Sequence, residues 1–148
     1  MEEVKIKIIS KSGFMPTYRT PGSAGMDLAA LLSAPIILEP FSRVMIPTGI
    51  FLEIPEGYEA QIRARSGISM NHGITMVNGV GTVDSDYRGE IKIPLINLGK
   101  SPFVIRSGDR IAQMVISSYE KVHWVPEEAL SATDRAAGGF GHTGKRED

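Results

Sequence analysis

The chain has 148 residues, of which 42% are hydrophobic and 22% charged, ordinary values for one globular domain with a sizeable core. A formal net charge of −1 excludes a general attraction of the whole molecule to nucleic acid or to an acidic membrane. The absence of cysteine excludes disulfides and thiolate metal sites. We see neither a signal-peptide pattern nor a stretch of about 18 apolar residues, so we expect a cytoplasmic protein with no membrane partner.

Apolar and polar residues alternate along residues 4–8, 58–64 and 91–95, which predicts half-buried strands. Turn signals separate these runs, among them Pro21-Gly22, Asn78-Gly79 and Ser107-Gly108. The one helix we expect is short, at residues 126–130, where a proline can occupy the first turn. Many short strands with frequent turns predict an all-β fold, a sandwich or a barrel.

Asp84 and Asp86 lie two residues apart in the stretch GVGTVDSDYRGEI. A structural turn is the commoner use of such aspartates, because their side chains cap backbone amides. The functional alternative is that one carboxylate is a general base or a cation ligand. If the segment is extended, the two side chains point to opposite faces, and one can pair with Arg88.

Three further stretches contain groups suited to nucleotide binding. Asn78-Gly79 predicts a hairpin whose free amides and carbonyls can read a base edge, with a plain type I′ turn as the alternative. The stretch Arg65-Ser66-Gly67 can cradle an anion, or it is a polar strand end. Gln113 interrupts an apolar run, either as a satisfied core amide or as a group that positions water.

The glycine-rich segment 135–148 has too little apolar content to hold a fixed place by itself, so a disordered tail is one interpretation. Residues 139–145 match the pattern G-x-x-x-x-G-K, but Arg146 follows where a phosphate-binding loop needs Ser or Thr, so we reject the match. Arg135 and Lys145 could still contact phosphates if the segment became ordered, and Phe140 could stack on a base. We therefore expect one domain at residues 1–134 and a flexible tail at 135–148.

Five stretches occur in an order and spacing that resemble the five motifs of the homotrimeric dUTPase family. Together they span nearly the whole chain: AGMDLAA (24–30), RARSGIS (63–69), NGVGTVDSDYRGEI (78–91), GDRIAQMVI (108–116) and RAAGGFGHTG (135–144).

The resemblance implies a compact, jelly-roll-like β-barrel that assembles as a homotrimer with active sites shared between subunits. It implies hydrolysis of dUTP to dUMP and pyrophosphate, which limits uracil incorporation into DNA and supplies dUMP for dTMP synthesis. Mg²⁺ is the implied cofactor, held through the triphosphate and waters and not by a protein cage, as befits an ion that keeps its waters.

The resemblance also implies a role for each matching residue. Asp84 orients and deprotonates the attacking water, Asp27 is a supporting structural carboxylate, and Gln113 helps to place the phosphate or the water. Tyr87 lies under the deoxyribose and leaves no room for a 2′-hydroxyl. Lys92 contacts the substrate beyond the hairpin.

The remaining implied contacts are distributed over three motifs. The uracil-reading hairpin would comprise Asn78 and the backbone from Gly79 to Val83, with Gly81, Thr82 and Val83 as substrate contacts. The phosphate-binding stretch would comprise Arg65, Ser66 and Gly67. The closing tail would contribute Arg135, Phe140 and Gly141.

Three positions depart from the family pattern: Asn71 stands where a basic residue is common, Ala136 replaces a usual glycine, and His142 a usual serine. Two rivals share the architecture. A dCTP deaminase needs a carboxylate aimed at the amino-bearing carbon of the pyrimidine, and we can place none. A nucleotide-sensing regulatory protein would be favoured by loss of Asp84 or of the tail, and both are present.

Overall fold

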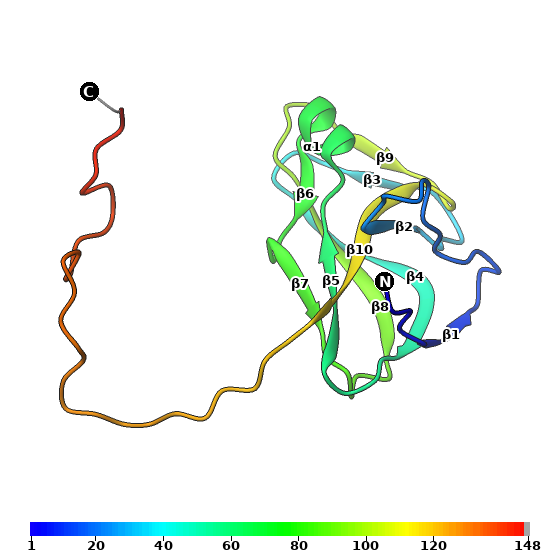
Figure 1. Cartoon of the computed structure of the whole chain (residues 1–148). Coiled ribbons are helices and arrows are strands. Elements are labelled where there is room, and N and C mark those ends of the chain that lie inside the picture. Colours follow the sequence, from blue (N-terminus) through cyan, green and yellow to red (C-terminus); the bar gives the residue numbers. More distant parts are fainter. Residues whose placement is uncertain (147–148) are drawn as a thin grey trace.

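The computed structural model describes residues 1–146 and builds two four-stranded antiparallel sheets and one two-stranded sheet (Figure 1). Glu147 and Asp148, the last two residues of the expected tail, lie outside the described residues. The first sheet has the order β1-β4-β8-β6, formed by Lys7–Ser10, Arg43–Glu53, Glu90–Asn97 and Ile74–Met76. The second has the order β2-β10-β5-β7, formed by Gly25–Ala29, Arg110–Ser118, Tyr58–Arg63 and Val80–Val83. The small sheet pairs β3 (Ile36–Leu38) with β9 (Phe103–Ile105).

The core lies between the two larger sheets, as the alternating pattern predicts. In β8 the residues Ile91, Ile93 and Leu95 are buried while Lys92 between them is exposed. In β5 the buried pair is Ala60 and Ile62. These side chains belong to one hydrophobic cluster that draws on both sheets, so the burial of apolar surface holds the layers together.

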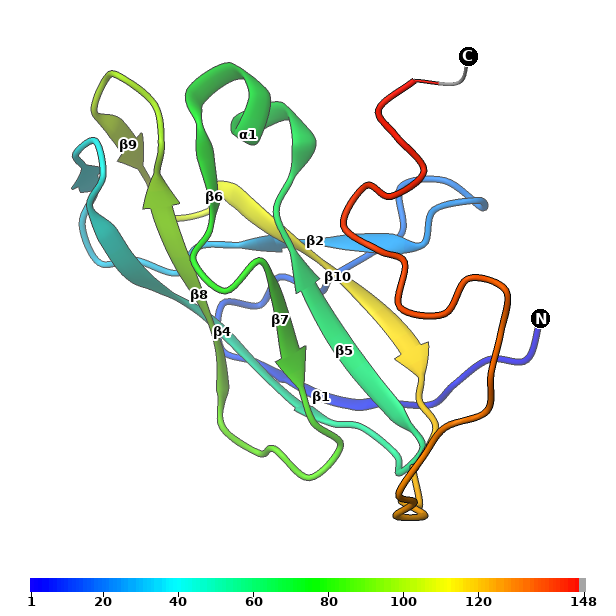
Figure 2. The same ribbon diagram turned by 90° about the vertical axis from the view of Figure 1, so that its left-hand side faces the viewer.

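The predicted all-β fold with one short helix is confirmed. Within residues 1–146 the two large sheets share no backbone ladder, so hydrogen bonds do not close them into a continuous barrel. Figure 2 shows the two layers from the side, with β7 and β6 at neighbouring outer edges.

The predicted position of the helix is wrong. Residues 126–130 are exposed and form no helix. Since these side chains are not buried, no tertiary packing stabilises a helix there, and a short helix without such packing is marginal in water. The helix of the structure is α1 (Ser66–His72), which directly follows the second motif. Gly73, in the left-handed region with φ of 73°, ends it, and Ile68 packs against the core. None of the described helices is long and apolar enough to cross a membrane.

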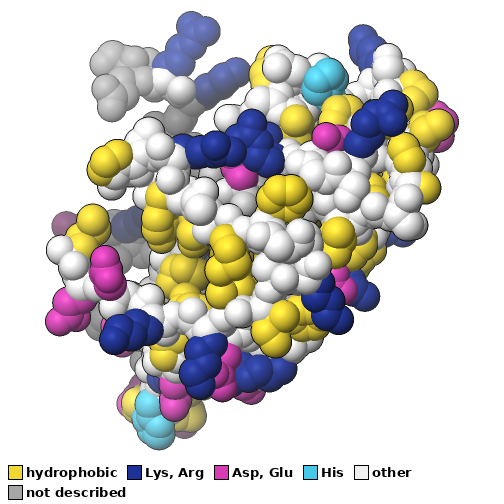
Figure 3. All heavy atoms as spheres, turned by 90° about the vertical axis from the view of Figure 1, so that its right-hand side faces the viewer, with side chains coloured by type: hydrophobic (Ala, Val, Ile, Leu, Met, Phe, Trp, Pro, Cys, Tyr) yellow, Lys and Arg dark blue, Asp and Glu magenta, His cyan; other side chains and the backbone are white. Residues whose placement is uncertain are grey.

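The chain leaves the two sheets after β10 and extends away from them (Figure 1). Between residues 119 and 146 it forms no helix or strand, and Trp124, Leu130 and Phe140 are exposed. Figure 3 shows another face, which includes the segment between β1 and β2; hydrophobic side chains lie on it among charged ones. Phe14, Met15 and Tyr18 in that segment are also more than half exposed.

Asn97, at the end of β8, is fully buried and joins three segments. Its Nδ2 donates to the carbonyl oxygens of Leu38 at 2.9 Å and Ser101 at 2.8 Å, and its Oδ1 accepts from the N–H of Gly99 at 2.8 Å. The side chain therefore holds the β8–β9 turn against β3.

We expect Asn97→Ala to lower the free energy of unfolding by about 3 kcal/mol, because it leaves buried backbone groups without partners. Urea unfolding measures the loss. Asn71→Ala, at an exposed helical position, is the matched control and should leave the midpoint almost unchanged. Equal midpoints for the two variants would contradict this role of Asn97.

Candidate functional site

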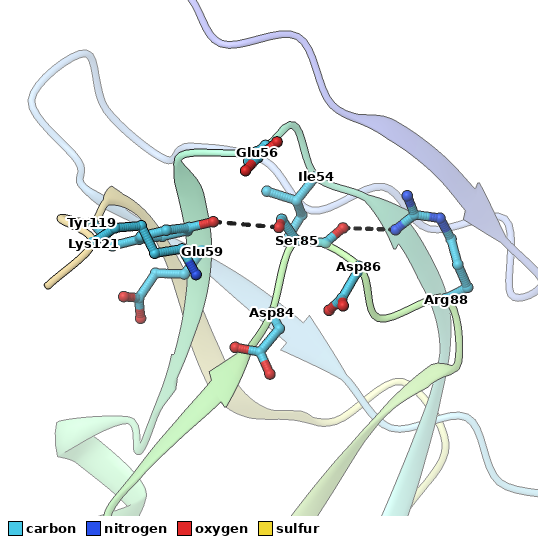
Figure 4. A pocket seen from close by; sticks show the side chains of 9 residues that line it. All are labelled: Ile54, Glu56, Glu59, Asp84, Ser85, Asp86, Arg88, Tyr119 and Lys121. Carbon is cyan, nitrogen blue, oxygen red and sulfur yellow. Dashed lines mark hydrogen bonds between the residues drawn. The ribbon is translucent and has the colours of Figure 1, made fainter. Parts of the chain in front are cut away.

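Asp84 follows the last residue of β7 and precedes a tight turn at Ser85 and Asp86. The segment is not extended, so the condition under which the two aspartates would point to opposite faces is not met. Both carboxylates line one open cleft of about 620 Å³, together with Glu59 from β5 (Figure 4). With Glu56, which also lines the cleft, the structure brings four carboxylates to one hollow at the end of the second sheet.

Arg88 does not pair with either aspartate. Its Nη2 lies 3.6 Å from Oε1 of Glu53, and its Nη1 donates to the carbonyl oxygen of Ser85 at 2.7 Å. Arg88 therefore ties the turn to β4 and leaves the carboxylates of the cleft open to a ligand or to water.

Tyr119 anchors the same turn from the other side. Its hydroxyl lies 3.5 Å from the Ser85 hydroxyl and accepts from the N–H of Gly57 at 3.2 Å (Figure 4). These two hydrogen bonds, with Ser85 the larger influence, lower the pKa of Tyr119 below that of an ordinary tyrosine. Ser85 and Tyr119 were not expected from the sequence, because their meeting depends on a tertiary contact between residues 34 positions apart.

The turn at Asn78-Gly79 does not close the predicted hairpin. β6 pairs with β8 and β7 pairs with β5, so the turn connects an edge of one sheet to an edge of the other. Gly79 has φ of 70°, but Asn78 is not among the residues of positive φ, which excludes the type I′ turn.

An open groove of about 320 Å³ lies between these two edges. Its lining includes six of the residues expected to hold the base and sugar, but not Gly79: Asn78, Gly81, Thr82, Val83, Tyr87 and Lys92. Because β7 is an edge strand, its outer amides and carbonyls have no strand partner within the described chain. The groove therefore combines backbone hydrogen-bonding groups with an aromatic ring, a suitable set for a small planar ligand.

A second cluster lies around Asp27 in β2. Oδ1 of Asp27 accepts from Nε of Arg65 and Oδ2 from Nη1 of Arg110, both at 3.1 Å. Nη1 of Arg65 also donates to the Arg110 carbonyl at 3.0 Å. The carboxylate thus orients two guanidinium groups beside the exposed residues Ser66 and Gly67.

Sequence reasoning did not single out Arg110. It is present in the fourth motif, but only the irregular register between β10 and β2 brings it to Asp27.

Gln113 lies in the same cluster. Its Nε2 donates to the carbonyl oxygen of Ala64 at 3.0 Å, directly before the Arg65 stretch. A Cβ on Gly25 would lie 2.5 Å from its Oε1, so Gly25 provides the space for the amide. Gln113 is therefore held by the two strands beside it and is half-buried, which leaves part of the amide accessible.

The carboxylate cluster at Asp84 and the cluster around Asp27 lie far apart in one chain. Asp27, Gln113, Arg63 and Val80 form one row across the second sheet, as the register shows. Asp84 lies four residues beyond Val80, a displacement of about 13 Å along the strand direction.

The tail residues Arg135, Phe140 and Gly141 join neither cluster. Nε of Arg135 donates to the Gly138 carbonyl at 2.7 Å, and Phe140 is fully exposed. Ala136 has φ of 48°, in the region that favours glycine, at the position where the family pattern has glycine. Gly138 lies against His142, where a Cβ would be 2.7 Å from the imidazole Cδ2.

His, Asp and Glu side chains do not gather in threes suited to a metal ion anywhere in residues 1–146. The open cleft at Asp84 leaves room for a Mg²⁺ ion that keeps its waters and takes its other ligands from a bound phosphate.

Comparison with known proteins is consistent across sequence and structure. The family model described as dUTPase matches residues 11–144. The deoxyuridine 5′-triphosphate nucleotidohydrolase of Finegoldia magna is 56% identical over 142 residues, which cover 95% of this chain and 99% of the relative. The protein of the same name from Cytophaga hutchinsonii is 53% identical over 141 residues, with 95% and 92% covered.

Solved structures show the same fold. The dUTPase of Staphylococcus bacteriophage 80alpha with dUPNHPP is 25% identical, with a TM-score of 0.85 and coverage of 97% of this chain and 99% of that chain. A mutant dUTPase from phage phi11 of S. aureus, described with a structural Mg(II) ion, is 22% identical, with a TM-score of 0.76 and coverage of 88% and 100%.

We expect Asp27→Ala to lower the free energy of unfolding by about 2 kcal/mol, because it removes the shared partner of the partly buried Arg65 and the exposed Arg110. Chemical denaturation measures the change. Asp134→Ala, an exposed aspartate of the C-terminal segment, serves as control and should cost nothing measurable. A loss no larger than that of the control would show that Asp27 does not hold the cluster together.

Proposed function

The chain belongs to the dUTPase family and is a deoxyuridine triphosphate nucleotidohydrolase, and we propose that it cleaves dUTP to dUMP and pyrophosphate with Asp84 as the general base. The supporting observation is the position of Asp84, at the end of the edge strand that borders the base-sized groove and facing an open cleft. An exposed carboxylate can accept a proton from a water within hydrogen-bond reach as that water attacks phosphorus.

Uracil selection is assigned to the free edge of β7 and to Asn78. The groove lies between two strand edges, so backbone donors and acceptors can alternate along the rim of a pyrimidine. Cytosine carries an amino donor where uracil has a carbonyl, and each group left unpaired costs about 1–3 kcal/mol.

Sugar selection is assigned to Tyr87. Its side chain is 41% exposed and lines the same groove as Thr82 and Lys92. A ring placed against the sugar leaves no room for a 2′-hydroxyl, and this exclusion discriminates against UTP. Lys92, exposed in β8, is positioned to contact the nucleotide beyond the ring.

Phosphate binding is assigned to Arg65, Ser66, Gly67 and Gln113. Asp27 and the Arg110 carbonyl hold two nitrogens of the Arg65 guanidinium, which reduces the freedom lost when it meets an anion. Phosphoryl chemistry depends chiefly on positioning and charge neutralisation, which this cluster would supply. Mg²⁺, carried by the triphosphate, would neutralise further charge when bound.

The separation of the two clusters supports a site shared between subunits. A general base and the groups that hold the attacked phosphate must converge within a few ångströms. In one chain Asp84 lies about 13 Å along the sheet from the row of Gln113, so the partner cluster comes from a neighbouring copy. A ring of three chains with head-to-tail contacts would form three such sites.

The segment 135–148 is assigned as a lid that closes over bound nucleotide. Residues 135–146 lie away from both clusters in the isolated chain, and the exposed Phe140 and the arginine at 135 have the chemistry to cover a base and a phosphate. A cytoplasmic location stays a prediction of the sequence.

We expect Asp84→Asn to lower kcat for dUTP by about 10²- to 10⁴-fold, because it removes the proton acceptor. Pyrophosphate release measures the rate, and calorimetry with dUTP should show that binding survives. Asp86→Asn, two residues away in the same cleft, is the matched control and should stay near the wild-type rate. If Asp84→Asn remains active, or if the two variants lose activity equally, Asp84 is not the base.

Mixed oligomers test the shared site. Chains with Asp84→Asn and chains with Arg65→Ala, each inactive alone, are co-expressed with different affinity tags and purified through both. In a closed ring of three, one interface of each mixed oligomer joins an intact Asp84 to an intact Arg65, so about a third of the activity should return. Mixed oligomers that stay inactive would place both clusters of each site in one chain.

A further inference from the structure

The distal end of the Tyr87 side chain is held by the residues that follow it. Its hydroxyl donates to the carbonyl oxygen of Glu90 at 2.8 Å, so the ring folds back over the intervening residue, Gly89. A Cβ built on Gly89 would lie 2.4 Å from the Tyr87 hydroxyl and 2.6 Å from each of its ring atoms Cε1 and Cζ. Real Cβ atoms do not approach so closely, so any side chain at position 89 displaces the ring.

The acceptor of this hydrogen bond is itself fixed. Glu90 begins β8 and pairs with Phe51 of β4. Its Oε2 accepts from the N–H of Gly49 at 3.0 Å, where the register of β4 shifts between Pro47 and Phe51. The Tyr87 ring is thus positioned against the central strands of the first sheet, and it cannot follow a shift of its own loop without losing the bond.

The restriction at position 89 comes from the ring and not from the backbone. Gly89 is not among the glycines of positive φ, so its backbone conformation is one that alanine can adopt. All three of the nearest atoms to the added Cβ belong to Tyr87. The closest atoms that an alanine here would meet are therefore those of the ring.

We infer that Gly89 is a specificity-determining residue. Because it has no side chain, the Tyr87 ring can occupy the space beside it, in the position where the ring excludes a ribose 2′-hydroxyl. The inference rests on the proposed role of Tyr87 in the same groove. It adds a positioning residue that touches no substrate and acts through the tyrosine alone.

The test compares dUTP with UTP as substrates of Gly89→Ala. Displacement of the ring should lower the ratio of kcat/KM for dUTP over UTP by about tenfold or more, the scale on which small steric changes in a pocket act. The loss should arise mainly from better use of UTP and from a raised KM for dUTP, with kcat for dUTP changed less. Gly22→Ala is the matched control, since a Cβ there meets nothing within 4 Å and should leave the ratio unchanged.

A double-mutant cycle with Tyr87→Ala identifies the route of the effect. Once the ring is gone, adding Gly89→Ala should change the ratio no further. A wild-type ratio for Gly89→Ala overturns the inference, and so does an equal effect of Gly89→Ala with and without the ring. If Gly89→Ala alone does not fold, the double variant should fold, because the clash is absent; a double variant that also fails to fold overturns it.

Tyr87→Ala by itself separates this inference from the proposed function. If that variant keeps the wild-type preference for dUTP, the role of Tyr87 in sugar selection is wrong, whatever Gly89 does. If it loses the preference while Gly89→Ala keeps it, only the role of Gly89 is wrong.

Discussion

The antiparallel register of β7 on β5 determines where Asp84 and the free edge of β7 lie. It sets Val80 beside Arg63 and leaves the outer edge of β7 without a strand partner within the described chain. It also carries Asp84 beyond the end of the strand into the cleft. A slip of one residue would turn the side chains of β7 to the opposite face and move the carboxylate out of the cleft.

Close packing of glycine against a functional side chain recurs in this molecule. Gly25 leaves space for the amide of Gln113, and Gly89 leaves space for the ring of Tyr87. In neither case does the backbone need the left-handed region, so the reason for glycine is the neighbour and not the dihedral angle. The glycines thereby leave room for Gln113 and Tyr87, and they add no side chain that would narrow the base-sized groove or the Asp27 cluster.

In the isolated chain the groups proposed to form the catalytic site lie in two separate clusters. The carboxylate of Asp84 and the guanidinium of Arg65 lie at different ends of one sheet, and the segment after β10 leaves Trp124 and Leu130 exposed. The proposed assembly would account for both features, because a neighbouring copy would supply the second cluster and cover apolar surface. In this view the activity belongs to the oligomer.

The sequence by itself determined the all-β class, the buried faces of β5 and β8 and the family, since period-two burial and five ordered motifs are local patterns. It misplaced the helix at residues 126–130, because helix propensity carries no information on whether a surface exists to pack against. It also read Asn78-Gly79 as a hairpin, whereas the turn joins two sheets. Only the tertiary structure decided the pairing of Asp27 with Arg110 and the contact of Ser85 with Tyr119. It also decided the packing of the Tyr87 ring against Gly89. Each of these contacts depends on how the chain folds back in space.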